Sequence, residues 1–223
     1  MDLGELQDRL GHRFDDVSYL ETALTHRSFS AEQPGNPHNE RMEFLGDAVL
    51  GLAVTRNLYV RYPDHPEGQL AKARASTVSR PRLAQVAEDL DVGELLRLGK
   101  GEVSTGGREK DSILADAMEA ILGAVFLDAG YEKARDVTLA HFGSIAEEMA
   151  TDPGSRDYKT RLQERLAVDG AIPQYVIESS GPDHAREFVA SVLVDGAVLG
   201  TGTGTSKKEA QQSAAAGALQ RLS

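Results

Sequence analysis

The spacing of apolar residues changes once along this chain of 223 residues, and that change limits what the chain can fold into. Up to about residue 150, apolar side chains recur every three to four positions, which is typical of helices that face a core. Further on, several segments alternate apolar and polar residues, which is typical of strands. The polar stretch Thr151–Ser155, with its proline and glycine, separates the two patterns. We therefore predict two domains, over residues 1–150 and 157–223, joined by a linker over 151–156.

The first domain is predicted to be all-α, and the second to be a small α+β domain with the order α-β-β-β-α. The helical segments of the first domain are 3–10, 16–27, 38–62, 67–77, 80–89, 111–128 and 131–150. In the second domain the helices are 158–168 and 206–222, and the strands are 174–179, 187–194 and 197–202. Asp195-Gly196 predicts a tight hairpin turn between the last two strands. Ser206 and Glu209 form a capping box that predicts where the last helix begins.

Charge is distributed unevenly between the two parts. Residues 1–155 hold 16 Lys and Arg against 27 Asp and Glu, whereas residues 156–223 hold 8 against 8, so the whole net charge of −11 lies in the first part. An acidic chain argues against nucleic-acid binding, but a neutral second domain leaves that function open. The chain has no cysteine, which excludes disulfides and thiolate metal sites and fits a reducing cytoplasm. No apolar run approaches the length that spans a bilayer, so we expect neither a membrane segment nor a targeting segment.

Three acids share one face of the helix predicted over 38–62. Glu40, Glu43 and Asp47 lie at i, i+3 and i+7, within about 60° of arc. A core stripe lies roughly opposite and contains Met42, Leu45, Val49 and Leu52. The acids are flanked by apolar Phe44, Leu50 and Val54 instead of the lysines and arginines expected on a solvated face. We therefore expect this helix to be buried nearly all round.

A second pair of acids lies on the apolar segment 113–127. Asp116 and Glu119 are its ionisable residues, three positions apart on one helix face, and the segment has no lysine or arginine. Burying an ionised carboxylate costs several kcal/mol even after relaxation, so grouped buried acids need a compensating cation. An ordinary acidic face remains the alternative for either motif taken alone. Two such sets on apolar helices favour oxygen-ligated Mg²⁺, or Mn²⁺ in its place.

The residues around these acids resemble the bacterial ribonuclease III family. NERMEFLGDAVL at 39–50 is very similar to the family motif, which is usually written with Leu at the position of Met42. Further family motifs occur in the same order and spacing: ALTHRSF at 23–29, EGQLAKARASTV at 67–78, LGKGE at 98–102, TGG at 105–107 and DSILADAMEAILGAVFLDAG at 111–130. The resemblance covers nearly the whole chain. It implies a double-strand-specific endoribonuclease with roles in ribosomal RNA precursor processing and in mRNA processing or decay.

Carried over by position, the resemblance implies which residues act. The metal-binding cluster would comprise Glu43, Asp47, Asp116 and Glu119, with Asp47 and Glu119 the catalytic pair that is hardest to replace. Glu40 and Glu67 match auxiliary acids. The resemblance implies that a metal-activated water attacks, leaving 5′-phosphate and 3′-hydroxyl ends with short 3′ overhangs, and that no small-molecule cofactor takes part.

The family works as a homodimer in which each subunit cuts one strand. Phe44 is implied to insert into the partner, and this would explain the apolar flanks beside the acids. Its alternative role is in the core of its own subunit. His26 and Arg27 belong to a family motif but have no assigned chemistry, and we expect a structural role for them.

Residues 157–222 resemble a double-stranded-RNA-binding domain through TRLQERL, GPDHAREF and GTGTSKKEAQQSAAAGAL. The resemblance implies that Gln163 and Glu164 on the first helix, and His184 in the loop after the first strand, reach successive minor grooves of the duplex. A turn-capping role is the alternative for His184.

Lys207 and Lys208 lie in the first turn of the last helix, where positive charge opposes the helix dipole. This placement favours a phosphate site over solvated charge. The family often has a third basic residue at the position of Gln211, so its absence predicts weakened, salt-sensitive binding.

Two other functions remain open at this point. A noncatalytic regulator would bind duplex RNA without cutting it, although the intact set of acids argues against this. A helical phosphohydrolase acting on small molecules would use the same metal chemistry, but it would leave the second domain unexplained.

Overall fold

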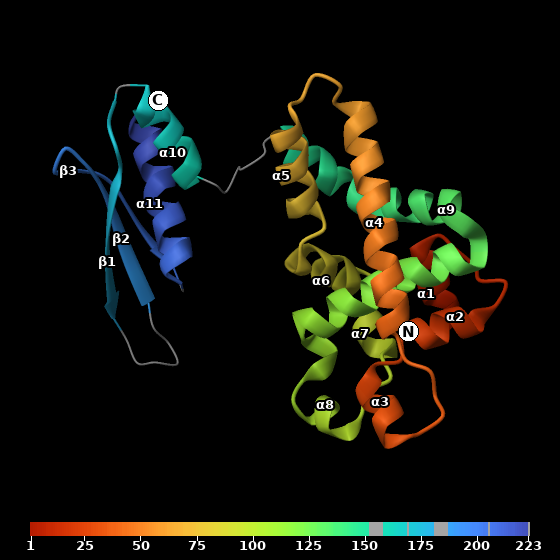
Figure 1. Cartoon of the computed structure of the whole chain (residues 1–223). Coiled ribbons are helices and arrows are strands. Elements are labelled where there is room, and N and C mark those ends of the chain that lie inside the picture. The colour runs from red at the N-terminus through yellow and green to blue at the C-terminus, as the bar shows by residue number, and fades with distance from the viewer. Residues whose placement is uncertain (152–157, 169, 181–186, 205, 223) are drawn as a thin grey trace. The chain divides into compact units, whose positions relative to one another are not determined.

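The computed structural model describes residues 1–151, 158–168, 170–180, 187–204 and 206–222, and the chain divides into two compact units, Met1–Thr151 and Asp152–Ser223 (Figure 1). The first unit is helical, and its elements are α1 Leu3–Leu10, α2 Val17–Ala23, α3 Arg27–Glu32, α4 Glu40–Arg61, α5 Glu67–Thr77, α6 Arg80–Asp89, α7 Val92–Leu95, α8 Lys100–Ser104, the 3₁₀ turn η1 Gly107–Glu109 and α9 Asp111–Thr151. None of the described helices is both long and apolar enough to cross a membrane.

Helix α9 joins two of the predicted helices across a sharp bend. Gly130 interrupts the helix with φ 77° and ψ −179°, a conformation that favours glycine. Just before the bend, the Asp128 carboxylate accepts hydrogen bonds from the backbone N–H groups of Asp15 and Asp16 and lies 2.8 Å from His12 Nε2. These bonds hold the pKa of Asp128 below its usual value, against the opposing effect of its desolvation. The bend of α9 is thus fastened to the chain between α1 and α2.

Several short helices differ from the prediction. The helix predicted over 16–27 ends at Ala23 as α2, and α3, α7, α8 and η1 were not predicted. The break between α2 and α3 follows from pairing with a distant segment, because Arg97 N–H donates to Leu24 O and His26 N–H donates to Arg97 O. Such a pairing has no signal in local apolar spacing, which explains the error.

Helices α4 and α9 cross in direct backbone contact (Figure 1). A Cβ placed on Gly46 of α4 would lie 1.8 Å from Glu119 O of α9, and one on Gly123 of α9 would lie 2.3 Å from Met42 O of α4. Real Cβ atoms do not approach backbone oxygen so closely, so both positions need glycine. The crossing brings the acids of the two helices to the same place.

One face of α4 is exposed, which corrects the expectation that this helix is buried nearly all round. Val49, Leu50 and Val54 are buried, but Phe44 is 82% exposed, Leu52 55%, Tyr59 72% and Val60 67%. Leu52 was wrongly predicted to belong to the core stripe. The same values show that Phe44 is not part of its own subunit's core, which was the alternative role considered for it.

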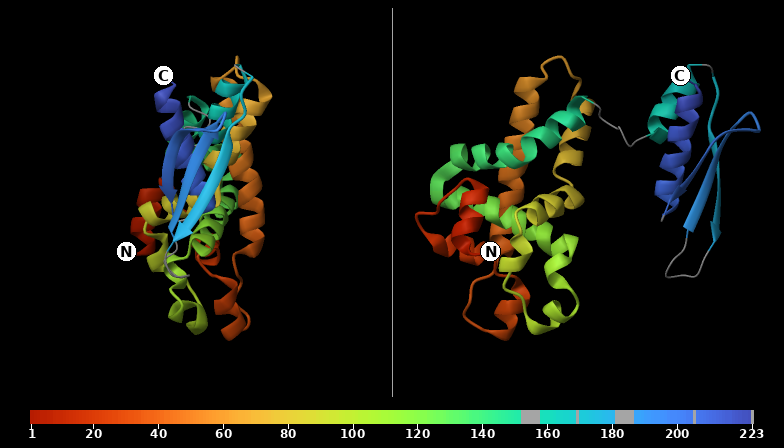
Figure 2. Two further views of the ribbon diagram at one scale, coloured as in Figure 1. Left: turned by 90° about the vertical axis from the view of Figure 1, so that its left-hand side faces the viewer. Right: turned by 180° about the vertical axis from the view of Figure 1, so that it is seen from behind.

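The second unit has the predicted α-β-β-β-α order. Its elements are α10 Tyr158–Ala167, β1 Gln174–Ser180, β2 Glu187–Val194, β3 Ala197–Gly204 and α11 Lys207–Arg221, and the antiparallel sheet has the order β1-β2-β3. Asp195 and Gly196 both have positive φ, 52° and 81°, as the predicted hairpin turn requires. Both helices lie on one face of the sheet (Figure 2).

Helix α11 lies almost directly on strand β3. A Cβ on Gly200 would lie 2.4 Å from Ala214 O, and one on Gly202 would lie 2.2 Å from Ala214 N. The facing positions Ala210, Ala214 and Ala218 of α11 are fully buried. Glycine on the strand and alanine on the helix therefore set the close spacing that the Ala-rich run favours.

We predict that Gly46→Ala lowers the free energy of unfolding by about 1–3 kcal/mol or more, because its methyl group overlaps the Glu119 carbonyl. Urea unfolding followed by circular dichroism measures the change. Gly51→Ala is the matched control on the same helix, since a Cβ there meets nothing within 4 Å. It should stabilise the helix by up to about 1 kcal/mol. Equal effects of the two substitutions would contradict the proposed backbone contact.

Candidate active site

Carboxylates from two helices meet where α4 and α9 cross. Glu43 of α4 and Asp116 and Glu119 of α9 each offer an oxygen, and these oxygens lie within 4.8 Å of one another. Two oxygens bound to one Mg²⁺ at about 2.1 Å are at most about 4.2 Å apart. Adjacent oxygens in an octahedral shell are only about 3.0 Å apart, so side-chain movements of about one to two ångströms would bring the three groups around one ion.

The cluster is costly for the protein without a counter-ion. Burial, then the charge of Asp47, then those of Glu43 and Asp116, raise the pKa of Glu119 to about 7. Burial raises the pKa of Glu43, and the charges of Asp116 and Glu40 raise it further. Burial also raises the pKa of Asp116. The folded protein thus holds like charges that favour either protonation or a bound cation.

A divalent cation fits this set of ligands. Within the described ranges, no lysine, arginine or histidine lies within the 4.0 Å of an ion pair from Glu43, Asp116 or Glu119. Arg80 is near enough to lower the pKa of each of these carboxyls without forming such a pair. All the ligands are hard carboxylate oxygens, the type that Mg²⁺ and Mn²⁺ prefer.

The remaining predicted acids occupy three different positions. Asp47, predicted as a fourth ligand, is exposed one turn after Glu43 and lies outside the group of three, but among charged neighbours it has the largest effect on the pKa of Glu119. Glu40 lies at the edge of the cluster, where its carboxylate is 3.3 Å from Arg27 Nη1 and 3.6 Å from His38 Nδ1. Glu67 opens α5, beyond the far end of α4, and the helix from Glu43 to Arg61 alone is about 27 Å long. Within one chain it does not reach the cluster.

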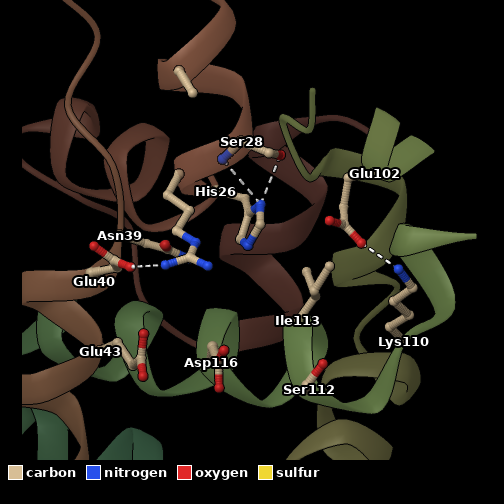
Figure 3. A pocket seen from close by; sticks show the side chains of 12 residues that line it. His26, Ser28, Asn39, Glu40, Glu43, Glu102, Lys110, Ser112, Ile113 and Asp116 are labelled. Carbon is tan, nitrogen blue, oxygen red and sulfur yellow. Dashed lines mark hydrogen bonds and ion pairs between the residues drawn. The ribbon is translucent and has the colours of Figure 1, made fainter. Parts of the chain in front are cut away.

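A polar cavity of about 790 Å³ opens beside Glu43 and Asp116 (Figure 3). Its wall includes His26 and Arg27 from the start of α3 and Glu102 with Lys110 from the segment before α9. Arg27 is paired with Glu40, and Lys110 with Glu102. The cavity therefore offers two cations whose present partners are carboxylates at its rim.

His26 and Asn39 shape the cavity from within. His26 Nδ1 accepts a hydrogen bond from Ser28 N–H and so caps α3, while burial lowers the pKa of its ring. This is a structural role, as expected from the sequence. Asn39, at the start of α4, is only 2% exposed, and its Nδ2 finds no partner in the described part of the chain. A buried donor of this kind is rare, and Asn39 lines the same cavity as Glu43 and Asp116 of the carboxylate cluster.

Sequence reasoning missed several of these residues. Asn39 and Lys110 stand within or beside family motifs, and Glu102 lies in LGKGE, but no chemistry was assigned to them. The only sequence feature that could have pointed to these three residues was their position near the acids of α4 and α9. For Arg80, at the start of α6, no sequence feature pointed to a role at the site.

Four of the five predicted RNA-binding residues lie on helices of the second unit. Gln163 and Glu164 are exposed on α10, and Lys207 and Lys208 are exposed in the first turn of α11. Ser206 caps that turn by accepting a hydrogen bond from Glu209 N–H at 3.2 Å. His184 lies outside the described residues.

Comparison with known proteins identifies the family. The family described as Ribonuclease-III-like matches residues 16–144, and the double-stranded RNA binding motif matches residues 158–222. The chain belongs to the ribonuclease III family. Ribonuclease 3 of Streptomyces coelicolor is 49% identical over 218 residues, covering 97% of this chain and 79% of the relative. Ribonuclease 3 of Mycolicibacterium paratuberculosis is 51% identical over 221 residues, covering 97% and 93%.

A solved structure agrees with the helical unit of this ribonuclease III. The nuclease domain of ribonuclease III from Campylobacter jejuni, described for flexibility in a region involved in dimer formation, is 40% identical with a TM-score of 0.61 and covers 64% of this chain and 97% of that one. The chain is thus a ribonuclease III family endoribonuclease with a duplex-RNA-binding domain, and the predicted fold class is confirmed. A phosphohydrolase acting on small molecules would not account for the second domain.

We predict that Glu119→Gln stabilises the metal-free protein at pH 8. A carboxyl whose pKa rises from about 4.5 in the unfolded chain to about 7 in the fold keeps its proton longer when folded. Folding stability therefore falls as pH rises from about 4.5 to about 7, and glutamine removes this loss. Thermal unfolding in a chelator should show a higher midpoint for the variant at pH 8 and no gain at pH 4.

Added Mg²⁺ should reverse the order by raising the midpoint of the unsubstituted protein more than that of Glu119→Gln. Glu109→Gln, which removes an exposed carboxylate in η1, serves as the control and should behave like the unsubstituted protein. A variant that gains nothing at pH 8 would show that Glu119 is not under electrostatic strain.

Proposed function

We propose that this chain is a Mg²⁺-dependent endoribonuclease specific for double-stranded RNA, with Mn²⁺ able to substitute. It hydrolyses phosphodiester bonds and leaves 5′-phosphate and 3′-hydroxyl ends with short 3′ overhangs. The proposal rests mainly on three carboxylate oxygens that lie within 4.8 Å of one another. They come from two helices, and among the described residues none of them forms an ion pair with a cation. The family's duplex-RNA-binding motif in the same chain supports the substrate.

The proposed roles of the residues follow from their positions. A divalent cation held by Glu43, Asp116 and Glu119 would supply an activated water and neutralise charge on the phosphate. Glu119 must lose its proton to act as a ligand, and its pKa of about 7 makes that loss easy at neutral pH once positive charge arrives. The charge of Asp47 raises the pKa of Glu119, so Asp47 would strengthen the negative field that attracts the cation. Arg27 and Lys110 line the adjoining cavity, where an RNA backbone would need positive charge.

We predict that Glu119→Ala lowers the rate of duplex-RNA cleavage by at least about 10³-fold, since it removes a ligand on which the electrostatic stabilisation of the reaction depends. Gel analysis of a long RNA duplex with Mg²⁺, with Mg²⁺ plus chelator, and with Mn²⁺ measures this. Glu109→Ala is the control for loss of an acid and should cleave normally. Undiminished cutting by Glu119→Ala would refute the proposed metal centre. Binding without cutting by the unsubstituted protein would favour a noncatalytic regulator.

We further propose that two copies of the chain assemble through the exposed face of α4. Phe44, Leu52 and Tyr59 lie within about 80° of arc on α4 and form an exposed apolar strip that begins next to Glu43. A strip of this kind is costly in a monomer. A twofold axis through such a strip would place two metal centres on one duplex, one for each strand. The nuclease domain from Campylobacter jejuni, with its region involved in dimer formation, supports this arrangement.

Phe44→Glu is predicted to convert the dimer to a monomer. Loss of a central aromatic contact costs about 2 kcal/mol or more, which weakens association by roughly 30-fold, and the added charge weakens it further. Sedimentation velocity measures the state, and cleavage of both strands should fall with it. Val17→Glu on α2, also an exposed apolar position, is the matched control. A Phe44→Glu protein that stays dimeric would place the interface elsewhere.

The substrates we propose are ribosomal RNA precursors and the structured regions of messenger RNA, which would place the enzyme in the cytoplasm. The family resemblance supports this assignment. The arrangement of the site is compatible with any duplex, because shape is read in the minor groove more than sequence.

A further inference from the structure

On helix α11 the neutral residue Gln211 follows Lys207 and Lys208, and the ammonium group of Lys159 from helix α10 lies against it. Lys159, near the start of α10, donates a hydrogen bond from Nζ to Gln211 Oε1 of α11 at 2.7 Å. Its backbone N–H donates to Oε1 of Gln212 at 3.1 Å. Its ammonium group also lies 4.8 Å from the centre of the Tyr175 ring of β1.

Gln211 stands on the same face of α11 as the two lysines of its first turn. It follows Lys207 by four residues and Lys208 by three, so at about 100° per residue it lies between them in angle, one turn further along the helix. The Lys159 ammonium, bonded to Gln211, therefore extends the positive patch that Lys207 and Lys208 begin. On α10, Gln163 follows Lys159 by four residues and shares its face.

We propose that Lys159 provides the third phosphate contact of the duplex-RNA surface, in place of a basic residue at Gln211. The inference rests on the proposed binding of duplex RNA and names one of its contacts. The positive charge then lies beside position 211 of α11, but it is carried by a residue of α10.

The contacts of Lys159 hold its charge without cancelling it. Both the Gln211 amide and the Tyr175 ring are neutral, and a cation over a ring is stabilised while its charge remains. An ammonium has three N–H donors, and Gln211 takes one of them in the described part of the domain. The Gln211 hydrogen bond and the Tyr175 ring position a side chain that would otherwise lose rotamer freedom on binding, so less entropy is lost when a phosphate arrives.

A purely structural role is the competing explanation, because Lys159 also fastens α10 to α11. The two roles differ in their dependence on salt. Each phosphate contact adds about 0.9 to the slope of log affinity against log salt concentration, whereas a contact within the domain adds nothing.

The test measures binding of the full chain to a blunt RNA duplex of about 20 base pairs, slightly longer than such a domain spans, in chelator so that no cutting occurs. Lys159→Met should reduce the salt slope by about 1. Its loss of affinity relative to the unsubstituted protein should accordingly shrink about 3.5-fold between 50 and 200 mM salt. Arg221→Met is the matched control, since it also removes one charge and one hydrogen bond, at the other end of α11. Its slope should be unchanged.

A double variant, Lys159→Met with Gln211→Lys, returns the charge to α11 and should restore the slope. Thermal unfolding of each variant tests whether the domain remains folded. A Lys159→Met protein that binds with an unchanged slope overturns the inference and leaves RNA binding intact. Failure of the unsubstituted protein to bind the duplex overturns the proposed function instead.

Discussion

The close crossing of α4 and α9 is the constraint on which the rest of the nuclease unit depends. Gly46 and Gly123 let the two backbones touch, and this contact brings an oxygen of Glu43 within 4.8 Å of oxygens of Asp116 and Glu119. With larger residues the helices would stand further apart, and each acid would be an ordinary solvated carboxylate. Close contact thus joins two commonplace acidic motifs into one site, in which the carboxylates are desolvated and repel one another. A divalent cation would offset this desolvation and repulsion, which raise the pKa values of the cluster.

The electrostatic cost of grouping these acids must be balanced by favourable interactions elsewhere in the fold, and the buried apolar side chains of α9 contribute to that balance. Met118, Ile121 and Leu122 are fully buried within one turn of Glu119, so α9 combines the most polar site with the least polar surroundings. The low polarity that makes the acids costly also strengthens their attraction for a cation. The bend of α9 is tied down by the Asp128 bonds to the chain after α1, which keeps its first half in one orientation. Stability and metal affinity therefore come from one arrangement.

The sequence was sufficient for the fold class and for the two acidic faces, because both follow from periodicity within single helices. It did not predict which helices cross, since that depends on backbone contact at glycines, which carry no periodic signal. The exposure of Leu52 was missed for a related reason: an apolar stripe reads the same whether it faces its own core or another subunit. Glu102 and Lys110 come to the cavity wall from a segment whose short helices are held by distant pairings. The acidic faces of the two helices were therefore predictable, and the surroundings of the cluster were not.

In the second unit, small residues again allow two elements to pack closely, here strand β3 and helix α11. Glycines of β3 and alanines of α11 bring helix and sheet together, and this leaves the helix ends and their side chains to define the binding surface. A motif search along α11 alone finds two lysines and a glutamine, and it predicts a weakened site. Packing of α10 against α11 supplies the third charge from Lys159, so a gap in a linear motif need not be a gap in the surface. This matters for a chain whose net charge of −11 lies outside the RNA-binding unit. Because salt at physiological concentration weakens that repulsion over a distance of about 8 Å, a few cations concentrated at one end of α11 can bind a duplex despite the net charge of the acidic unit.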